Sequence, residues 1–342
     1  MNNQHMQLNR WIIVLILLPF ISGCAGMVHK RFVQNFSKER QETDGSFSSL
    51  IASLKYNEKK QFLAVGLESG QIEIWDINKS HSKIEFKAHE YPANMLSFTS
   101  DGAILFSGSK FEQSAKLWNV KTGELIQTIR KMKGPVSTTP DKDIYVVANG
   151  DYVSLYNLSR GIIYPEKYAS GGLITVMASD DSSGLVAIGS ESGTIEVWRY
   201  TKNKGNKALV KVSSARPYSN GDWVVGLQFS PRGKSLYSIA RFGSFSEWDP
   251  VTFEEKKSVP TVLKHIYSTS FYRDKNILAL AGTEEKPGLG SASVEVISLD
   301  TNESTVYRLN ISLAMVEILP PLSSFIASQG KLTSVQKLPR KK

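Results

Sequence analysis

Apolar and polar residues alternate along most of this chain, in short runs that are separated by small or polar turn residues. In the stretch 62–77, apolar residues alternate on both sides of Glu68, Ser69 and Gly70. Alternation with a period of two predicts two strands, and a small polar trio between them predicts a tight hairpin. The same arrangement recurs at 184–198. The pattern therefore predicts an all-β chain that is built from hairpins.

One phrase of the sequence, IEIWDI at 72–77, returns in altered form along the chain. Its aromatic residue, or the residue in the same place, recurs at intervals of 38 to 50 residues, at Trp75, Trp118, Tyr156, Trp198, Trp248, Ile297 and Val335. A period in this range indicates an array of units, none of which can bury its apolar face alone. Alternating stretches also lie before and after each hairpin, so each unit is predicted to have four strands, like a blade of a β-propeller.

Residues at fixed places in these units resemble WD40 repeats. The resemblance rests on Ser-Pro-x-Gly and Ser-Asp-Gly turns, on the Trp or Trp-Asp that closes third strands, and on a His, a Ser and a Trp in the second unit. The residues that carry it are Trp75, Asp76, His89, Ser107, Trp118, Trp198, Trp248 and Asp249. In WD40 proteins such a His, Ser and Trp join an Asp of the turn between the second and third strands in a buried hydrogen-bonded tetrad. Here that turn, 109–112, reads SKFE and has no Asp, so the tetrad is expected to be incomplete.

Counting third strands predicts seven four-stranded blades. The last unit, 312–338, has three strand-like runs and then ends. Its fourth strand is expected at 31–36, because this segment has the length and alternation of a strand and WD40 propellers commonly close in this way. Closure would also hide an edge strand that otherwise promotes aggregation. The expected fold is therefore an all-β, WD40-like propeller of seven four-stranded blades, closed by an N-terminal strand.

Residues 1–23 differ from the rest of the chain and are predicted to be a secretory signal peptide. A polar start with one cation leads into an apolar run at 11–20, which is too short to span a bilayer. The sequence ISGC, which ends at Cys24, resembles the lipobox of bacterial lipoproteins, in which the cysteine thiol is acylated. Cys24 is the only cysteine of the chain and cannot form an internal disulfide. We therefore predict lipidation at Cys24, rather than a buried cysteine.

The predicted organisation is a signal peptide at 1–23, a lipidated tether at 24–30, a propeller at 31–338 and a basic tail at 339–342. The tether reaches only about 20 Å at full stretch, so the propeller is expected to lie close to the membrane on its extracytoplasmic side. In enteric-type sorting an Asp after the lipidated Cys retains a lipoprotein in the inner membrane. This chain has Ala25 there, which favours the periplasmic face of the outer membrane in a Gram-negative host.

Charge limits the class of partner. The chain has 41 Lys and Arg against 32 Asp and Glu, a formal net charge of +9. A nucleic-acid-binding surface would need a continuous basic stripe with aromatic side chains between the cations. Here Lys and Arg cluster only at 202–211 and in the tail, so no nucleic-acid partner is expected. Attraction to anionic headgroups or cell-wall polymers, or plain solubility, accounts for the excess.

Two units are longer than the others, and insertions in repeat proteins usually mark the binding face. The insertions lie at 212–223 and 283–293 and are expected to share one face with the turn at 110–112. They carry residue types that are enriched at interface hot spots. The predicted partner-binding residues are Arg216, Tyr218, Trp223, Lys110, Phe111 and Lys286. The alternative is that these are solvated loops and that Trp223 caps the core.

Motifs of enzymes are scarce. The five histidines are too scattered to suggest a metal cluster, and no P-loop, H-E-x-x-H or G-x-S-x-G motif occurs. An S-x-x-K at 328–331 and a K-T-G at 121–123 match motifs of penicillin-binding proteins, but their order is reversed and no helix aligns the first. We expect no catalytic residue, no metal and no cofactor.

The sequence thus predicts a lipid-anchored propeller that serves as a rigid platform for a protein partner in the cell envelope. A closed propeller presents preorganised loops, which lowers the ordering cost of association. The alternatives are a propeller that binds an envelope glycan or another small ligand in its central channel, and an enzyme that acts there. The sequence leaves the identity of the partner open.

Overall fold

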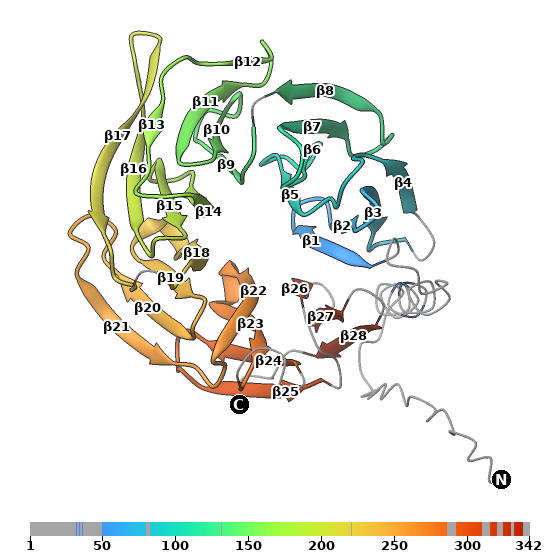
Figure 1. The fold of residues 1–342 in the computed structure, drawn as a ribbon, viewed down its shortest axis with the longest axis vertical. Helices are drawn as coiled ribbons and strands as arrows, with labels where there is room; N and C mark the ends of the chain where they lie inside the picture. Colours follow the sequence, from blue (N-terminus) through green and yellow to red (C-terminus); the bar gives the residue numbers. More distant parts are fainter. Residues whose placement is uncertain are drawn as a thin grey trace, which may run out of the picture.

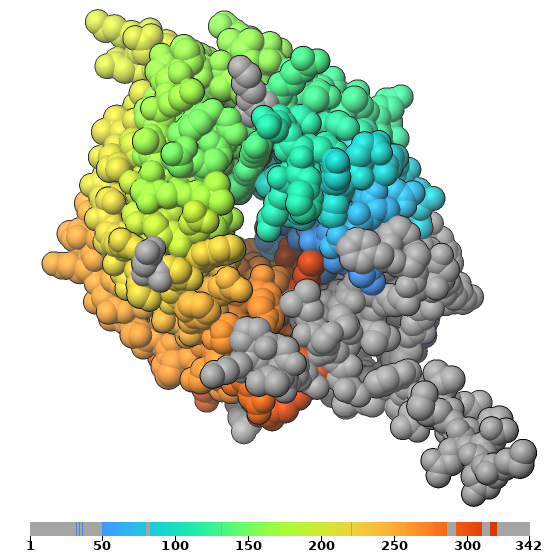
Figure 2. Space-filling view, in the orientation of Figure 1, coloured from blue at the N-terminus to red at the C-terminus, as the bar shows by residue number. Residues whose placement is uncertain are grey.

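The computed structural model describes residues 50–79, 83–130, 132–219, 221–285, 292–309 and 315–319, together with Phe32, Gln34, Phe36 and the backbone of 324–329 and 332–337. Its strands form seven antiparallel sheets. The sheets follow one another around a ring, and the first strand of each lies next to the centre (Figure 1). Figure 2 shows an opening at the centre of this ring.

Six of the sheets have four or five strands. The first three consist of β1 (Ile51–Asn57), β2 (Phe62–Leu67), β3 (Gln71–Asp76) and β4 (Lys83–Lys87); of β5 (Met95–Phe98), β6 (Ile104–Gly108), β7 (Ser114–Asn119) and β8 (Leu125–Arg130); and of β9 (Val136–Thr138), β10 (Ile144–Asn149), β11 (Tyr152–Asn157), β12 (Ile162–Ile163) and β13 (Tyr168–Ala169). In the third sheet β12 and β13 both pair with β11, so its outer strand is divided in two.

The next three sheets consist of β14 (Ile174–Asp180), β15 (Leu185–Ser190), β16 (Ile195–Asn203) and β17 (Asn206–Ala215); of β18 (Val224–Phe229), β19 (Leu236–Ala240), β20 (Ser244–Trp248) and β21 (Glu255–Pro260); and of β22 (His265–Tyr272), β23 (Ile277–Thr283), β24 (Ala292–Ser298) and β25 (Ser304–Arg308). Two 3-10 turns, η2 (Pro231–Gly233) and η3 (Arg273–Lys275), connect the first and second strands of the fifth and sixth sheets. Among the described residues, the seventh sheet consists of β26 (Met315–Leu319), β27 (Ser324–Gln329) and β28 (Leu332–Lys337).

The WD40-like propeller fold predicted from the sequence is confirmed, but the prediction of seven four-stranded blades is wrong. The structure has six complete blades, and within the described residues the remaining sheet has three strands. The segment expected to supply that strand is helical at Phe32, Gln34 and Phe36. A strand would place these three side chains on one face, whereas a helix places Phe32 and Phe36 together and Gln34 elsewhere. Both phenylalanines are buried and Gln34 is exposed, so burial of the aromatic pair favours the helix.

The two phenylalanines close the ring. Their rings stack with centroids 5.7 Å apart, and that of Phe36 meets the edge of Trp75 at 5.1 Å. They share one apolar cluster with Trp75 of the first blade and with Leu319 of the three-stranded sheet. At the same junction the amide of Tyr56 donates to Glu317 Oε1 at 2.8 Å. Side-chain contacts thus close the ring at this junction, where a shared strand was expected.

The core of the described residues is divided among the junctions between neighbouring sheets. Its buried apolar side chains form seven clusters, and each joins one sheet to the next. Second and third strands are covered on both faces, and β15 for example is buried along its whole length. In outer strands such as β21, more buried and more exposed residues alternate, because only one face of the strand is covered. The apolar faces that the sequence pattern left without partners are therefore buried against the next blade.

The meander of each sheet places its connections at two ends. We call the end with the second-to-third-strand turns and the connections between blades the loop face. We call the end with the first-to-second and third-to-fourth-strand turns the turn face. No helix in the described part of the chain is long and apolar enough to cross a bilayer. The predicted signal peptide, Cys24, the tether, the basic tail and Lys286 lie outside the described residues.

Closure by the aromatic pair predicts a contrast between neighbouring positions. Replacing Phe32 or Phe36 by Ala is expected to lower the free energy of unfolding by about 3–5 kcal/mol, because each change leaves a cavity beside Trp75. Gln34→Ala, on the exposed side, is expected to change it by less than about 0.5 kcal/mol. Urea denaturation of the three variants measures the difference. Equal losses at all three positions would contradict closure by these rings.

Candidate functional site

The second blade contains a complete hydrogen-bonded tetrad. His89 is 1% exposed, and its Nδ1 lies 2.7 Å from Glu112 Oε2 while its Nε2 lies 2.7 Å from Ser107 Oγ. Trp118 Nε1 donates to the same Ser107 Oγ at 2.8 Å. The expectation of an incomplete tetrad is therefore wrong. Glu112 takes the place of the missing Asp, because its extra methylene lets a carboxylate reach His89 from the same turn.

The tetrad joins two connections of the loop face. Glu112 lies in the turn between β6 and β7, and its Oε1 also accepts the amide of Glu90, which precedes β5, at 2.8 Å. Burial lowers the pKa of His89 below its ordinary value, although Glu112 acts in the opposite direction. Burial also raises the pKa of Glu112, but the hydrogen bonds from His89 and from the Glu90 amide outweigh it and lower that pKa. The resting pair is therefore a neutral imidazole that donates to a carboxylate.

The fifth blade has the same arrangement with a different donor. Tyr218 occupies the place of the histidine, and its hydroxyl lies 2.6 Å from Ser238 Oγ, to which Trp248 Nε1 donates at 2.7 Å. Tyr218 is 7% exposed. The structure thus places this predicted partner-binding residue inside the blade, where it positions the loop above it.

The first and fourth blades hold their tryptophans in a third way. Trp75 Nε1 donates to Glu73 and Trp198 Nε1 donates to Glu196, at 2.9 and 3.1 Å. Each Glu lies two residues earlier on the same strand, and so on the same face of it. In the fourth blade Lys211 pairs with Glu196 at 2.7 Å and covers the Trp198 ring at 4.9 Å. The first and fourth blades therefore satisfy the indole N–H with a residue of the same strand.

The two aspartates of the repeat cap turns on the opposite face. Asp76 Oδ1 accepts the amide of Asn78, and Asp249 Oδ1 accepts the amides of Val251 and Thr252, at 2.9 to 3.0 Å. These bonds fix the start of the turn between the third and fourth strands. The two Trp-Asp pairs thus mark where the third strands of the first and fifth blades end, as the sequence predicted.

Large apolar side chains gather on the loop face. Tyr91 and Phe111 pack against each other with ring centroids 5.8 Å apart, although they are 53% and 69% exposed. They come from the two connections that the tetrad of the second blade holds together. Lys110 is also exposed there, and its amide donates to Asn94 Oδ1 at 3.0 Å. Phe111 and Lys110 thus lie on the predicted face, in a turn that is held by the tetrad beneath it and by the hydrogen bond to Asn94.

A second group, the aromatic cluster, lies over the fifth and sixth blades and consists of Trp223, Arg241, Phe242 and His265. The Arg241 guanidinium lies 5.0 Å from the Trp223 ring and 5.8 Å from the Phe242 ring. His265 meets the Phe242 ring edge-on at 5.2 Å. Trp223 is 39% exposed and Phe242 is 48% exposed. The cluster presents two partly exposed rings with a cation between them.

Backbone hydrogen bonds fix the aromatic cluster. The amide of Arg241 donates to Trp223 O at 2.8 Å, and that of Ile266 donates to Arg241 O at 2.7 Å. The buried carboxylate of Asp222 accepts the amide of Phe242 at 2.8 Å. Burial raises the pKa of Asp222, although this hydrogen bond opposes the shift. Three connections are thus tied together, and the rings are held in place before any partner binds.

The remaining sequence-predicted residues lie around this cluster. Arg216 is exposed, and its Nε donates to Ser192 O at 2.9 Å, while Trp223 is part of the cluster itself. Sequence reasoning missed Arg241, Phe242 and His265, because they lie in a turn and a connection of ordinary length. The sequence signal that could have revealed Arg241 and Phe242 is the turn RFG at 241–243. The corresponding turns of the first and fourth blades read ESG and carry neither a cation nor an aromatic ring.

The buried histidine predicts how stability depends on pH. Because the pKa of folded His89 is below its ordinary value of 6.5, the unfolded chain takes up a proton that the folded chain resists. Its contribution to stability is therefore complete above that pH and is lost as the pH falls through it, by up to about 1.4 kcal/mol per pH unit. His89→Gln is expected to flatten the fall in unfolding free energy between about pH 7.5 and about pH 5.5. An equally steep fall in the variant would contradict this role.

Comparisons with known proteins agree with the geometry. Residues 80–119 match the family described as WD domain, G-beta repeat. The chain is 27% identical over 154 residues to Apoptotic protease-activating factor 1 of Danio rerio, and 24% identical over 262 residues to Nuclear distribution protein nudF of Aspergillus niger. These matches cover 44% and 69% of this chain, but only 12% and 53% of the two relatives. The chain thus spans less than two thirds of either relative.

A solved structure shows the same fold. The β-propeller domain of Cps50 (Swd1) from Myceliophteria thermophila matches with a TM-score of 0.70 over 87% of this chain and 99% of that chain. At 14% sequence identity, this similarity speaks for the fold alone. The matched repeat, the tetrad within it and the ring of blades lead to one conclusion: this chain contains a WD40 repeat and folds as a WD40-like β-propeller.

Proposed function

We propose that this protein is an interaction platform that binds a protein partner through its loop face, and that it contributes binding and not catalysis. One observation carries the proposal. Six of the twelve exposed large apolar side chains of the described residues lie in the connections of this face: Tyr91, Phe111, Leu173, Trp223, Phe242 and Val262. Exposed apolar groups that gather on one face typically mark an interaction site.

The chemistry of the face suits a protein partner. Tyr, Trp and Arg are the residue types that most often dominate binding energy at interfaces, and the aromatic cluster combines Trp223 with Arg241. The exposed cations Arg216 and Lys264 lie in the two connections beside it and supply a polar rim. Since the backbone of the cluster is tied by hydrogen bonds, little conformational entropy is lost on binding. WD40 propellers generally bind protein partners, which agrees with this proposal.

We further propose that the platform is held in the cell envelope by lipid on Cys24. Support comes from the sequence: an apolar run, the lipobox-like ISGC and the only cysteine of the chain. Only seven residues separate Cys24 from Phe32, which is packed into the junction that closes the ring. A lipid on Cys24 would therefore hold the propeller close to the membrane surface. Several acyl chains would anchor it firmly, whereas one would bind only marginally.

Crosslinking tests the loop face. The tagged full-length protein is crosslinked in intact cells, and the captured proteins are compared by quantitative mass spectrometry. A specific partner of the wild type is expected to be lost, by about tenfold or more, in Trp223→Ala/Phe242→Ala, because truncating hot-spot rings costs 2 kcal/mol or more each, to order of magnitude. Capture that survives in the double variant would place the interface elsewhere.

Two control variants separate this effect from loss of folding. Val251→Ser removes an equally exposed apolar side chain from the turn face, and Tyr218→Phe removes only the buried hydroxyl in the fifth blade. Both are expected to capture the partner as the wild type does. Loss of capture in all variants would indicate a general defect and not a loop-face interface.

Fractionation tests the anchor. The wild type is expected in the membrane fraction with a metabolically incorporated acyl label. Cys24→Ala is expected to lose the label and the membrane association, because no other thiol is present to be acylated. An unlabelled wild type, or a Cys24→Ala protein that keeps the label, would refute lipidation at this residue.

A further inference from the structure

The centre of the ring contains a cavity of about 360 Å³, near the turn-face ends of the first strands. It is lined by side chains from the first strands of all seven sheets. Most of these residues lie in the last part of their strands, such as Ser179 in β14 and Thr269 in β22, or directly after them, such as Glu58 after β1. Ligand sites usually have volumes of about 300–1,000 Å³, so the cavity has room for a small molecule.

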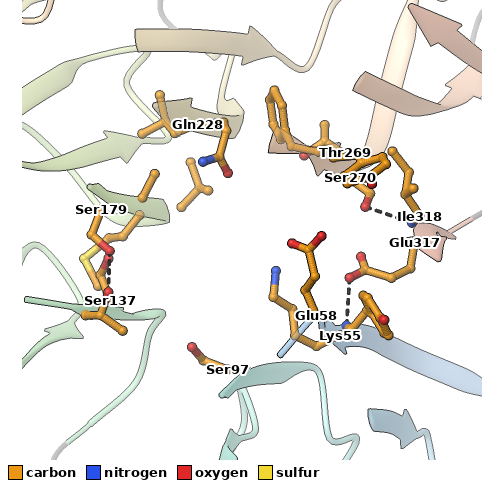
Figure 3. Close-up of a pocket in the computed structure, with 18 of the residues that line it drawn as sticks. Lys55, Glu58, Ser97, Ser137, Ser179, Gln228, Thr269, Ser270, Glu317 and Ile318 are labelled. Carbon is orange, nitrogen blue, oxygen red and sulfur yellow. Dashed lines mark hydrogen bonds between the residues drawn. The ribbon is translucent and has the colours of Figure 1, made fainter. Parts of the chain in front are cut away.

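Opposite sides of the cavity differ in chemistry (Figure 3). Lys55, Glu58 and Glu317 lie on one side, where the first and seventh sheets meet. Hydroxyl groups lie on the other side, where Ser179 Oγ is 2.8 Å from Thr138 Oγ1 and Ser137 is close by. The Thr138 hydroxyl donates to Asp181 Oδ1 at 2.8 Å, so its oxygen is left as an acceptor. The amide of Gln228 and the hydroxyl of Thr269 border both sides. A ligand in the cavity would therefore meet charge on one side and neutral donors and acceptors on the other.

The charged side holds two carboxyl groups and one ammonium group. Glu317 is 7% exposed and accepts the amide of Tyr56; burial raises its pKa, and the charge of Lys55 opposes that shift. Glu58 is exposed to the cavity, and its side chain has no hydrogen bond or ion pair within the described residues. Burial, and after it the charge of Asp274, raises the pKa of Glu58. Lys55 thus acts on Glu317, and Glu58 has no ion pair within the described residues.

An organic cation fits this side better than a metal ion. No group of three or more His, Cys, Asp and Glu side chains suited to hold a metal occurs in the part of the chain that the structure describes. A single carboxylate can instead accept a charge-assisted hydrogen bond from an ammonium group. The hydroxyl and amide groups opposite would then bind polar groups attached to that ammonium.

We propose that the turn-face end of the central channel is a binding site for a small hydroxylated ammonium compound, with the ammonium group at Glu58 and the hydroxyl groups at Ser137, Thr138 and Ser179. This site is distinct from the proposed protein-binding surface. The aromatic cluster lies on the loop face, at the other end of the ring, so a small ligand and a protein partner bind at opposite ends of one molecule.

Calorimetric titration of the full-length protein with glucosamine and with glucose tests the site, because the two probes differ in the amine. Glucosamine is expected to bind and to raise the melting temperature, and glucose to bind at least about tenfold more weakly. Glu58→Gln is expected to lower the affinity for glucosamine by about tenfold, since it removes the charge but keeps the shape. Ser179→Ala is expected to weaken both probes.

Two further variants make the outcome decisive. Glu254→Gln removes an exposed carboxylate from a turn outside the cavity and is expected to bind glucosamine as the wild type does. Trp223→Ala/Phe242→Ala, which tests the loop face, is expected to keep glucosamine binding as well. Absence of glucosamine binding by the wild type, equal binding of both probes, or unchanged binding by Glu58→Gln would each overturn the proposal, whatever happens to partner capture.

Discussion

Burial of apolar surface between neighbouring blades is the interaction on which the whole molecule depends. A single four-stranded sheet has two faces and can cover neither alone, so each blade is stable only between two others. The junction between the first sheet and the last is the one that closes the structure, because it turns a row of blades into a ring. The structure closes it with Phe32 and Phe36 against Trp75 and with Glu317 on the Tyr56 amide.

The blades meet a common requirement with different side chains. Each buried indole N–H needs an acceptor, since an unpaired donor in the core costs about 1–3 kcal/mol. The second blade uses Ser107 and the fifth uses Ser238, whereas the first and fourth use a Glu of the same strand. The imidazole of His89 and the phenol of Tyr218 play equivalent roles, because each bonds to the serine hydroxyl that accepts the indole N–H. Sequence divergence among the blades therefore leaves the physical design of the ring unchanged.

The two proposed binding sites follow from that design. Because the blades are fixed against one another, their connections form a stable surface on which rings such as Trp223 and Phe242 can stay exposed without collapsing together. The same ring holds its first strands apart at the centre, where a packed core would otherwise bury Glu58 and the hydroxyl groups opposite it. One surface suits a large partner and the other a small polar ligand.

The sequence by itself determined the repeat, the strands and the positions of the buried tryptophans, because alternation and period are local properties of the chain. It also singled out Trp223, Phe111 and Arg216 as candidates on one face. Only the tertiary structure decided that Phe32, Gln34 and Phe36 are helical, that Glu112 completes the tetrad and that Tyr218 points inward. It alone brought Arg241 and Phe242 beside Trp223, and Glu58 opposite Ser179. These contacts join residues far apart in the chain, and no local pattern encodes which of them meet when the ring closes.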